Sequence, residues 1–397
     1  MGAAGLLAPI GIRALDQLVP SSAAATLPIK HVLISVNENR SFDSYYGYAP
    51  FSGKYGVPAG YTQPDGSGGT VTPIPNDSVI TPDPNHDWTS IHSEWNNGKM
   101  DGFYTTNGSA GITYTTAQEL QFYYSLFPNS TLCVNYFCSV LSDTFPNRLY
   151  IAGGTSGGIT TNNISAGELN WPIILDLLEA AGITWKVYNT TTTCSVSSGL
   201  SQFYCDNQFE FFQRWYQDPR VISYTSSNYF SDLKNNNLPQ VSFLQTNDLT
   251  GEHPPYGLNV GENLQNQLIG ALKTSPYWAS SAYFLTYDEG GGIFDHVPPP
   301  VFDAYGAGIR VPAWVISPYA KKGHLEPTQY EHASLLKFVE RVFNLPTLAS
   351  QNHEFDTQTP GGPNNQAADG QPVGPPAPPR DGRSDIGDMM QCFHFPA

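Results

Sequence analysis

The chain has 397 residues, enough for one large domain or two smaller ones, and carries a formal net charge of −16. This charge argues against a nucleic-acid partner, because the sequence has no basic stripe to neutralise phosphates. Only 13% of the residues are charged, while neutral polar side chains are abundant, as suits an exported protein. Beyond the N-terminal segment no apolar run is long enough to span a bilayer, so we expect no transmembrane segment.

The two ends of the chain differ in composition from its middle. Residues 1–26 are apolar and end in small side chains, so we expect the remnant of an export leader or an N-terminal helix. We expect residues 27–397 to form a single domain that is secreted or extracytoplasmic. Its Pro/Gly-rich stretch at 356–383 is expected to be an extended surface segment.

Apolar runs and helical periodicity alternate along the chain. The first expected strand is 31–36, and a long irregular excursion rich in Gly and Pro follows at 50–82. The later elements are expected in this order: strand 149–152, helix 171–181, strand 184–188, helix 230–235, strand 240–245, helix 262–273, strand 282–287, strand 311–316 and helix 331–343. This alternation predicts an α/β fold with a mainly parallel central sheet flanked by helices.

The chain has five cysteines in loop-like surroundings. Their spacing favours short disulfides in an oxidising compartment over a zinc site, because neither close pair is C-x-x-C. We therefore expect Cys133 to bond Cys138 and Cys194 to bond Cys205, with Cys392 free.

Polar clusters follow four of the expected strands. Asp288 and Glu289 come directly after the apolar strand 282–287 and precede three glycines. The other clusters are Glu38-Asn39, Thr155-Ser156 and Glu252-His253. Because ligands bind at the carboxyl ends of the strands in open α/β sheets, we expect these side chains to share one site.

The residue types in these clusters suit metal-assisted phosphoryl chemistry. Four side chains offer oxygen ligands to a divalent cation: Glu38, Asn39, Asp288 and Glu289. The hydroxyl of Thr155 is a plausible nucleophile beside such a cation. The imidazoles of His86 and His253 could bind phosphate oxygens or protonate a leaving group.

A competing motif is the G-x-S-x-G elbow of serine hydrolases, which residues 154–158 fit after the expected strand 149–152. The triad would combine Ser156 with Asp288 or Asp295 and with His296 or His332. We rank this serine carboxylesterase hypothesis well behind, because it leaves Glu38 and Asn39 without roles.

Several segments resemble, in order, the signatures of a known family. They read ENRSFDSYYG at 38–47, PNRLY at 146–150 followed by AGGTSGG, EHPP at 252–255 and YDEGGGIFDHVPPP at 287–300. This series resembles the phosphoesterase family that holds bacterial and plant non-specific phospholipases C and a bacterial acid phosphatase. The matches run from about residue 30 to about residue 345.

The resemblance implies an alkaline-phosphatase-like fold and the hydrolysis of phosphate esters with one divalent metal ion, whether Ca, Zn, Mn or Mg. It implies the four metal ligands named above, a Thr155 that is transiently phosphorylated, and phosphate contacts from His86 and His253. We also expect Ser156 and His296 to bind substrate. Many relatives have histidine at three positions that differ here, namely Ser44, Gly157 and Gly290.

Within this family, phospholipase C activity is favoured and acid phosphatase activity is the alternative. Phospholipase C action requires an apolar lip that touches lipid. The aromatic segments 45–51 and 122–127 are candidates for this lip.

Overall fold

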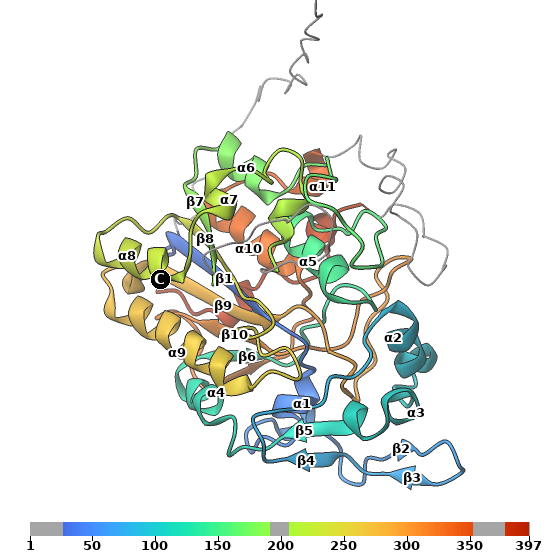
Figure 1. Cartoon of the computed structure of the whole chain (residues 1–397). Coiled ribbons are helices and arrows are strands. Elements are labelled where there is room, and N and C mark those ends of the chain that lie inside the picture. The colour runs from blue at the N-terminus through green and yellow to red at the C-terminus, as the bar shows by residue number, and fades with distance from the viewer. Residues whose placement is uncertain (1–26, 191–205, 352–377, 397) are drawn as a thin grey trace, which may run out of the picture.

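The computed structural model of the chain describes residues 27–190, 206–351 and 378–396 (Figure 1). The expected leader or helix at 1–26, the cysteines Cys194 and Cys205, and most of the segment 356–383 lie outside the described residues. Among the described residues, no helix is both long enough and apolar enough to cross a membrane.

A seven-stranded sheet forms the centre of the fold, with the strand order β11-β6-β10-β9-β1-β8-β7. The four strands β9, β1, β8 and β7 are parallel, whereas β10 runs antiparallel to both β9 and β6. The strands are β1 (His31–Asn37), β6 (Thr131–Cys133), β7 (Trp185–Asn189), β8 (Val241–Gln245), β9 (Ser281–Tyr287), β10 (Ala313–Ile316) and β11 (His324–Glu326). The predicted α/β class with a mainly parallel sheet is confirmed.

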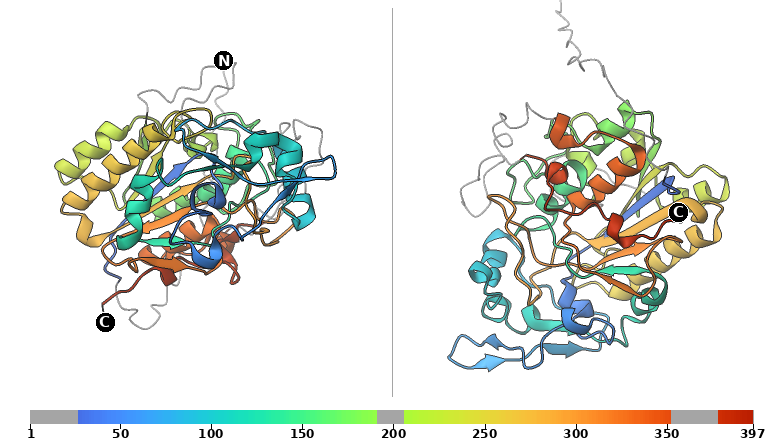
Figure 2. Two further views of the ribbon diagram at one scale, coloured as in Figure 1. Left: turned by 90° about the horizontal axis from the view of Figure 1, so that it is seen from below. Right: turned by 180° about the vertical axis from the view of Figure 1, so that it is seen from behind.

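Helices cover both faces of this sheet (Figure 2). Successive residues of a strand point to opposite faces, and β9 shows which helix covers which. The Tyr283 hydroxyl donates to Gln265 of α9 at 2.8 Å, while the Phe284 ring packs on Phe338 of α10 with centroids 4.8 Å apart. The helices are α1 (Phe42–Tyr46), α2 (Trp88–Trp95), α3 (Phe103–Asn107), α4 (Gln121–Leu126), α5 (Thr144–Gly153), α6 (Ile174–Ala180), α7 (Pro219–Ile222), α8 (Ser226–Lys234), α9 (Leu258–Thr274), α10 (Ala333–Phe343) and α11 (Leu348–Gln351).

The strand register determines where the polar clusters emerge. Strand β1 lies between β8 and β9, and Asn37 at its end is paired with Tyr287 at the end of β9. Glu38 and Asp288 therefore leave the sheet side by side. The excursion after α1 lies beyond this edge of the sheet (Figure 1) and includes β2 (Gln63–Pro64), β3 (Thr70–Val71), β4 (Ile74–Asn76) and β5 (Thr113–Thr115).

One predicted strand is wrong. Residues 149–152 belong to α5, which ends at Gly153 and is capped by Gly154 in the left-handed conformation with φ of 70°. Every residue of this helix is buried, so its sequence lacks the polar face that reveals a helix. The short strands β6 and β11, with three residues each, were not predicted.

The predicted disulfide between Cys133 and Cys138 is also wrong. Both are buried free thiols in the structure. The Cys138 Sγ atom lies 3.8 Å from the carbonyl oxygen of Val140. The Cys133 Sγ atom instead lies 3.6 Å from the Sγ atom of Cys392. Cys133 closes β6, and its side chain faces the C-terminal segment rather than the loop that carries Cys138.

The aromatic segments expected to form a lipid-binding lip are mostly core. Tyr45, Tyr46 and Tyr123 are at most 1% exposed. Tyr48 is 45% exposed, but its ring stacks on Tyr114 with centroids 4.0 Å apart. Neither segment presents the apolar surface that the prediction required.

Candidate active site

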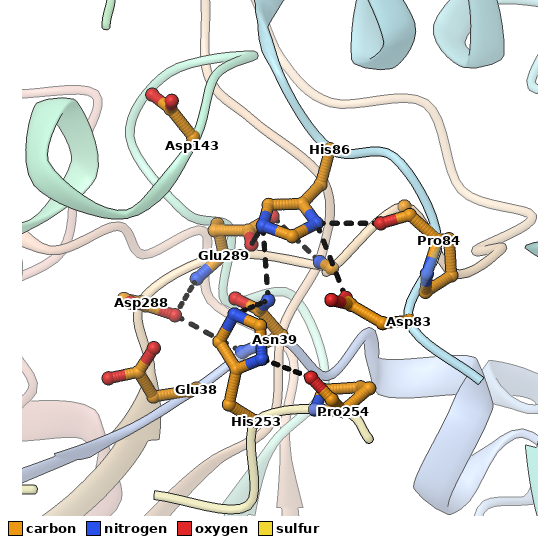
Figure 3. A network of polar contacts seen from close by, with 12 residues as sticks. Glu38, Asn39, Asp83, Pro84, His86, Asp143, His253, Pro254, Asp288 and Glu289 are labelled. Atoms are coloured by element: carbon orange, nitrogen blue, oxygen red, sulfur yellow. Dashed lines mark hydrogen bonds and ion pairs between the residues drawn. The ribbon is translucent and has the colours of Figure 1, made fainter. Parts of the chain in front are cut away.

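The predicted metal ligands leave the sheet side by side where β1 and β9 end (Figure 3). Glu38 and Asn39 follow β1, and Asp288 and Glu289 follow β9. All four side chains are at most 1% exposed. The sequence thus correctly predicted that residues about 250 positions apart come together at one edge of the sheet.

Arg148 of α5 joins the two carboxylates nearest the sheet. Its guanidinium donates to Glu38 Oε1 at 2.9 Å and to Asp288 Oδ2 at 3.0 Å, and it is itself fully buried. The other oxygen of Asp288 accepts from the backbone N–H groups of Asn39 at 3.2 Å and Glu289 at 2.8 Å. Hydrogen bonds to both oxygens therefore hold the Asp288 side chain in place before any ligand arrives.

Asn39 connects this carboxylate pair to two imidazoles. Its Nδ2 atom lies 2.9 Å from His253 Nε2 and 3.3 Å from His86 Nε2. Each imidazole Nδ1 contacts a backbone carbonyl, that of Pro84 at 2.8 Å for His86 and that of Pro254 for His253. A carbonyl oxygen can only accept, so each Nδ1 atom carries the proton of this contact and each ring turns its Nε2 atom toward the Asn39 amide.

Two oxygens of the predicted ligand set have no hydrogen-bond partner among the described residues, although both are buried. They are Asn39 Oδ1 and Glu289 Oε1. The second lies 4.0 Å from His86 Nε2, while Glu289 Oε2 accepts from the Gly291 N–H at 2.7 Å. A buried polar atom without a partner is costly, so each such atom in a folded protein calls for a ligand or an explanation.

Carboxylates outnumber cationic groups in this region. Burial, followed by repulsion from Asp206 and Asp288, raises the pKa of Glu38 well above its usual range. Burial and the neighbouring Asp288 do the same to Glu289. Several buried carboxyl groups around one arginine form an environment that a divalent cation would neutralise. The residues present therefore fit a bound cation.

The four predicted ligands are not gathered tightly around one point. Among the described residues, three groups bring acidic or imidazole donor atoms within 4.8 Å of one another. They are Asp83 with His86 and His253, Asp43 with Asp295 and His296, and Glu38 with Asp206 and Asp248. The side chain of Arg148 lies between Glu38 and Asp288, and this explains why these two are joined through it rather than directly.

The N-terminal end of α5 also reaches the site, and sequence reasoning missed it. Asp143 precedes the helix, and its side chain stands on the far side of Glu289 from Asn39 (Figure 3). Burial raises the pKa of Asp143 to about 6, and the nearby His86 opposes the shift. The next residue, Thr144, is the first of α5 and is 5% exposed. The signal in the sequence was the D-T-F-P-N-R string, with a helix-starting proline near an acidic cap.

Thr155 and Ser156 lie at the other end of α5. The ten residues of this helix span about 15 Å, so the structure does not bring these hydroxyls to Asp143. The Thr155 hydroxyl accepts from the Gly157 N–H at 3.0 Å, and the Ser156 hydroxyl lies beside the Tyr150 phenol. Because a helix, and not a strand, precedes Ser156, the nucleophile-elbow hypothesis is wrong.

His296 belongs to a separate group. Its Nδ1 atom lies 2.5 Å from Asp43 Oδ2, and its backbone N–H donates to the same oxygen at 2.8 Å. Arg310 links Asp43 to Asp295 in this group. The contacts hold His296 in place, and its substrate-binding role stays a prediction.

Of the three positions where many relatives have histidine, the two glycines, Gly157 and Gly290, lie against neighbours that leave no room for a larger side chain. A Cβ atom at Gly290 would lie 2.8 Å from the Ile309 side chain, and one at Gly157 would lie 2.7 Å from the Trp171 ring. A larger residue at either position would require these neighbours to move.

The sequence model of the Phosphoesterase family matches residues 29–346. Non-hemolytic phospholipase C of Burkholderia pseudomallei is 30% identical over 86% of this chain and 59% of that protein. Phospholipase C B of Mycobacterium tuberculosis is 30% identical over 80% of this chain and 74% of that protein. Non-specific phospholipase C4 of Arabidopsis thaliana is 26% identical over 84% of this chain and 71% of that protein.

The chain spans 59% of the length of the Burkholderia relative. Among solved structures, a protein in the alkaline phosphatase superfamily from Vibrio parahaemolyticus aligns over 80% of this chain and 68% of its own. Its TM-score is 0.41 at 11% identity.

Proposed function

The chain belongs to the Phosphoesterase family, and from this premise we propose that it is an exported, metal-dependent hydrolase of phosphate esters. One observation carries the proposal. Two buried oxygens, Asn39 Oδ1 and Glu289 Oε1, have no hydrogen-bond partner among the described residues and lie within a group of carboxylates. Oxygen donors of this kind are the ligands that hard and borderline divalent cations take in proteins.

We propose Glu38, Asn39, Asp288 and Glu289 as the residues that hold the cation. A bound cation would neutralise phosphate oxygens and favour the ionised form of a nearby hydroxyl. The protein's own contribution is to fix the ligands, since Arg148 holds Glu38 and Asp288 while Gly291 holds Glu289. Metal analysis of the purified protein tests this step. Loss of activity in chelator with recovery on adding one cation is expected, and full activity in a metal-free sample would contradict it.

The nucleophile has two candidates. Thr155, the sequence-based prediction, lies about 15 Å along α5 from the end that faces the site. Thr144 begins this helix, and the helix dipole favours a phosphate group at the N-terminal end. We therefore propose Thr144 as the nucleophile. Its Oγ1 atom would lose its proton and form a bond to phosphorus, while the ester oxygen leaves with the bonding electrons and takes up a proton. Attack of water on phosphorus would then break the Oγ1–P bond and release the phosphate.

The matched pair Thr144→Ala and Thr155→Ala tests this assignment. Removing the nucleophile should lower turnover by several orders of magnitude and abolish a phosphoprotein adduct seen by intact mass after acid quenching. Thr155→Ala should keep the adduct. The opposite ranking would restore the Thr155 hypothesis, while an adduct retained in both variants would rule out both.

Within this class we favour phospholipase C activity, because the relatives named above carry that name. Exposed apolar side chains on the two loops that carry the histidines support it. Ile80 and Tyr256 are 56% and 44% exposed, and the Tyr256 N–H donates to the carbonyl of His253 at 2.8 Å. Hydrolysis of phosphatidylcholine beside hydrolysis of a nitrophenyl phosphate separates the two activities. A strong preference for the monoester would instead favour the acid phosphatase alternative.

A further inference from the structure

Two buried thiols that are far apart in the sequence lie against each other. Cys133 ends β6, and Cys392 lies at the end of a short 3-10 turn near the C-terminus. Their Sγ atoms are 3.6 Å apart, and both side chains are fully buried. At this distance the two sulfur atoms are in van der Waals contact.

Noncovalent contacts already hold the two backbones together. The carbonyl oxygen of Cys392 accepts from the Thr131 hydroxyl at 3.1 Å and from the Lys321 N–H at 2.9 Å. Beyond Cys392, the Phe393 ring stacks on Phe338 of α10 with centroids 5.1 Å apart. The folded chain therefore presents the two thiols to each other without any covalent link.

We propose that Cys133 and Cys392 form a disulfide bond when the protein folds in an oxidising compartment. The bond length of about 2.05 Å requires the sulfur atoms to approach by about 1.5 Å, which small rotations of the two side chains supply. Each thiol loses a proton and one S–S bond forms. The two electrons pass to the disulfide of an oxidoreductase or to glutathione disulfide, which is cleaved to two thiols.

The other described cysteine does not compete for either thiol. The Cys138 Sγ atom lies against the carbonyl oxygen of Val140, and its side chain is close to Gly308, where a Cβ atom would collide with it. Because Cys133 and Cys392 are buried in the finished fold, the exchange with the oxidant must precede the final packing of the C-terminal segment.

The bond would attach the C-terminal segment 378–396 to β6, the strand next to the edge strand β11 of the central sheet. That segment carries Arg380, whose Nη1 atom donates to the carbonyl of Ser139 at 2.7 Å and whose backbone N–H donates to that of Gly154 at 2.8 Å. These contacts fall just before and just after α5. The disulfide would thus hold in place the segment that braces the helix leading into the candidate active site. This proposal does not depend on the proposed activity.

Peptide mapping tests the proposal directly. The full-length protein is refolded in a glutathione redox buffer, alkylated in denaturant without reductant, and digested with trypsin and chymotrypsin. Cleavage after Tyr136 or Phe137 separates Cys133 from Cys138, so each pairing gives a distinct linked peptide. We expect the Cys133–Cys392 peptide. Alkylation of both residues, or a Cys133–Cys138 peptide, would overturn the proposal.

Stability measurements give a second readout. Cys133→Ser and Cys392→Ser should each lower the Tm of the oxidised protein by roughly 5 °C or more, because the bond closes a long loop. The double variant should be no less stable than either single one. Cys138→Ser is the matched control and should keep the linked peptide. Additive losses in the double variant would show independent packing effects and would contradict the bond.

Discussion

Replacing Arg148 with methionine is the sharpest test of how the site is held together. Arg148 is fully buried and donates to Glu38 and Asp288, and also to the carbonyl of Asp206 at 2.8 Å and to Gln245 Oε1 at 3.1 Å. Methionine keeps much of the apolar stem but removes every one of these donors. Two buried carboxylates then lose their cationic partner.

The expected loss follows from these contacts. A hydrogen bond to a charged group contributes about 1.5–3 kcal/mol, so the two carboxylate contacts alone amount to about 3–6 kcal/mol. The typical loss of stability when one partner of a buried ion pair is removed is also about 3–5 kcal/mol. We therefore expect Arg148→Met to lower the free energy of unfolding by about 3–5 kcal/mol in chelator. Arg214→Met, which removes a 56% exposed arginine paired with Asp176, should change it by at most about 1 kcal/mol.

Denaturant unfolding, monitored by fluorescence with and without a divalent cation, provides the assay. A cation in the same carboxylate group should stabilise the Arg148→Met variant more than the wild type, because it replaces the missing positive charge. Equal stabilisation of both proteins would mean that the cation binds away from Glu38 and Asp288. A loss below about 1 kcal/mol in chelator would refute the claim that Arg148 compensates buried charge.

Three further predictions follow from the site. Burial is the main reason that the pKa of His332 is lowered from 6.5 to about 4, so the unfolded chain binds this proton first as the pH falls. The free energy of unfolding should therefore decrease between pH 6.5 and pH 4. Denaturant unfolding of His332→Gln should lack about 3 kcal/mol of this decrease. His86→Ala and His253→Ala should each lower turnover by roughly 10²–10⁴-fold, and the residue that protonates the leaving group should matter less on nitrophenyl substrates; no loss for either would exclude them from the site. Ile80→Ser with Tyr256→Ser should weaken hydrolysis of phosphatidylcholine vesicles but not of a soluble ester, and equal effects on both would remove these side chains from the lipid-binding role.

Much of the site was predictable because its residues follow strand ends. Apolar strands at 31–36 and 282–287 ended at Glu38 and Asp288, and the parallel pairing that brings them together is the ordinary outcome of an α/β alternation. Their metal-ligand role is untested and stays a prediction. The acidic pair after a buried strand was itself informative, because buried carboxylates need a partner.

The failures have physical causes too. Helix α5 is buried on all sides, so residues 149–152 looked like a strand and placed Thr155 at a strand end that does not exist. That error hid Asp143 and Thr144, which begin the same helix. The disulfide error arose because sequence proximity favours Cys133 with Cys138, whereas pairing in a fold depends on where β6 and the C-terminal segment meet.

The charge of the site bears on which activity is favoured. Burial and neighbouring carboxylates raise the pKa of Glu38 and Glu289, so protons compete with a cation for these groups at pH values where ordinary glutamates are ionised. Cation affinity should therefore fall as the pH falls. Without the cation, a phosphate anion would face carboxyl groups with no positive metal charge between them. An acid phosphatase would have to retain its metal under those conditions. Titrating bound metal between neutral and acidic pH decides the point: loss of metal together with activity favours a phospholipase C that works near neutral pH, whereas retention of both in acid would favour the phosphatase.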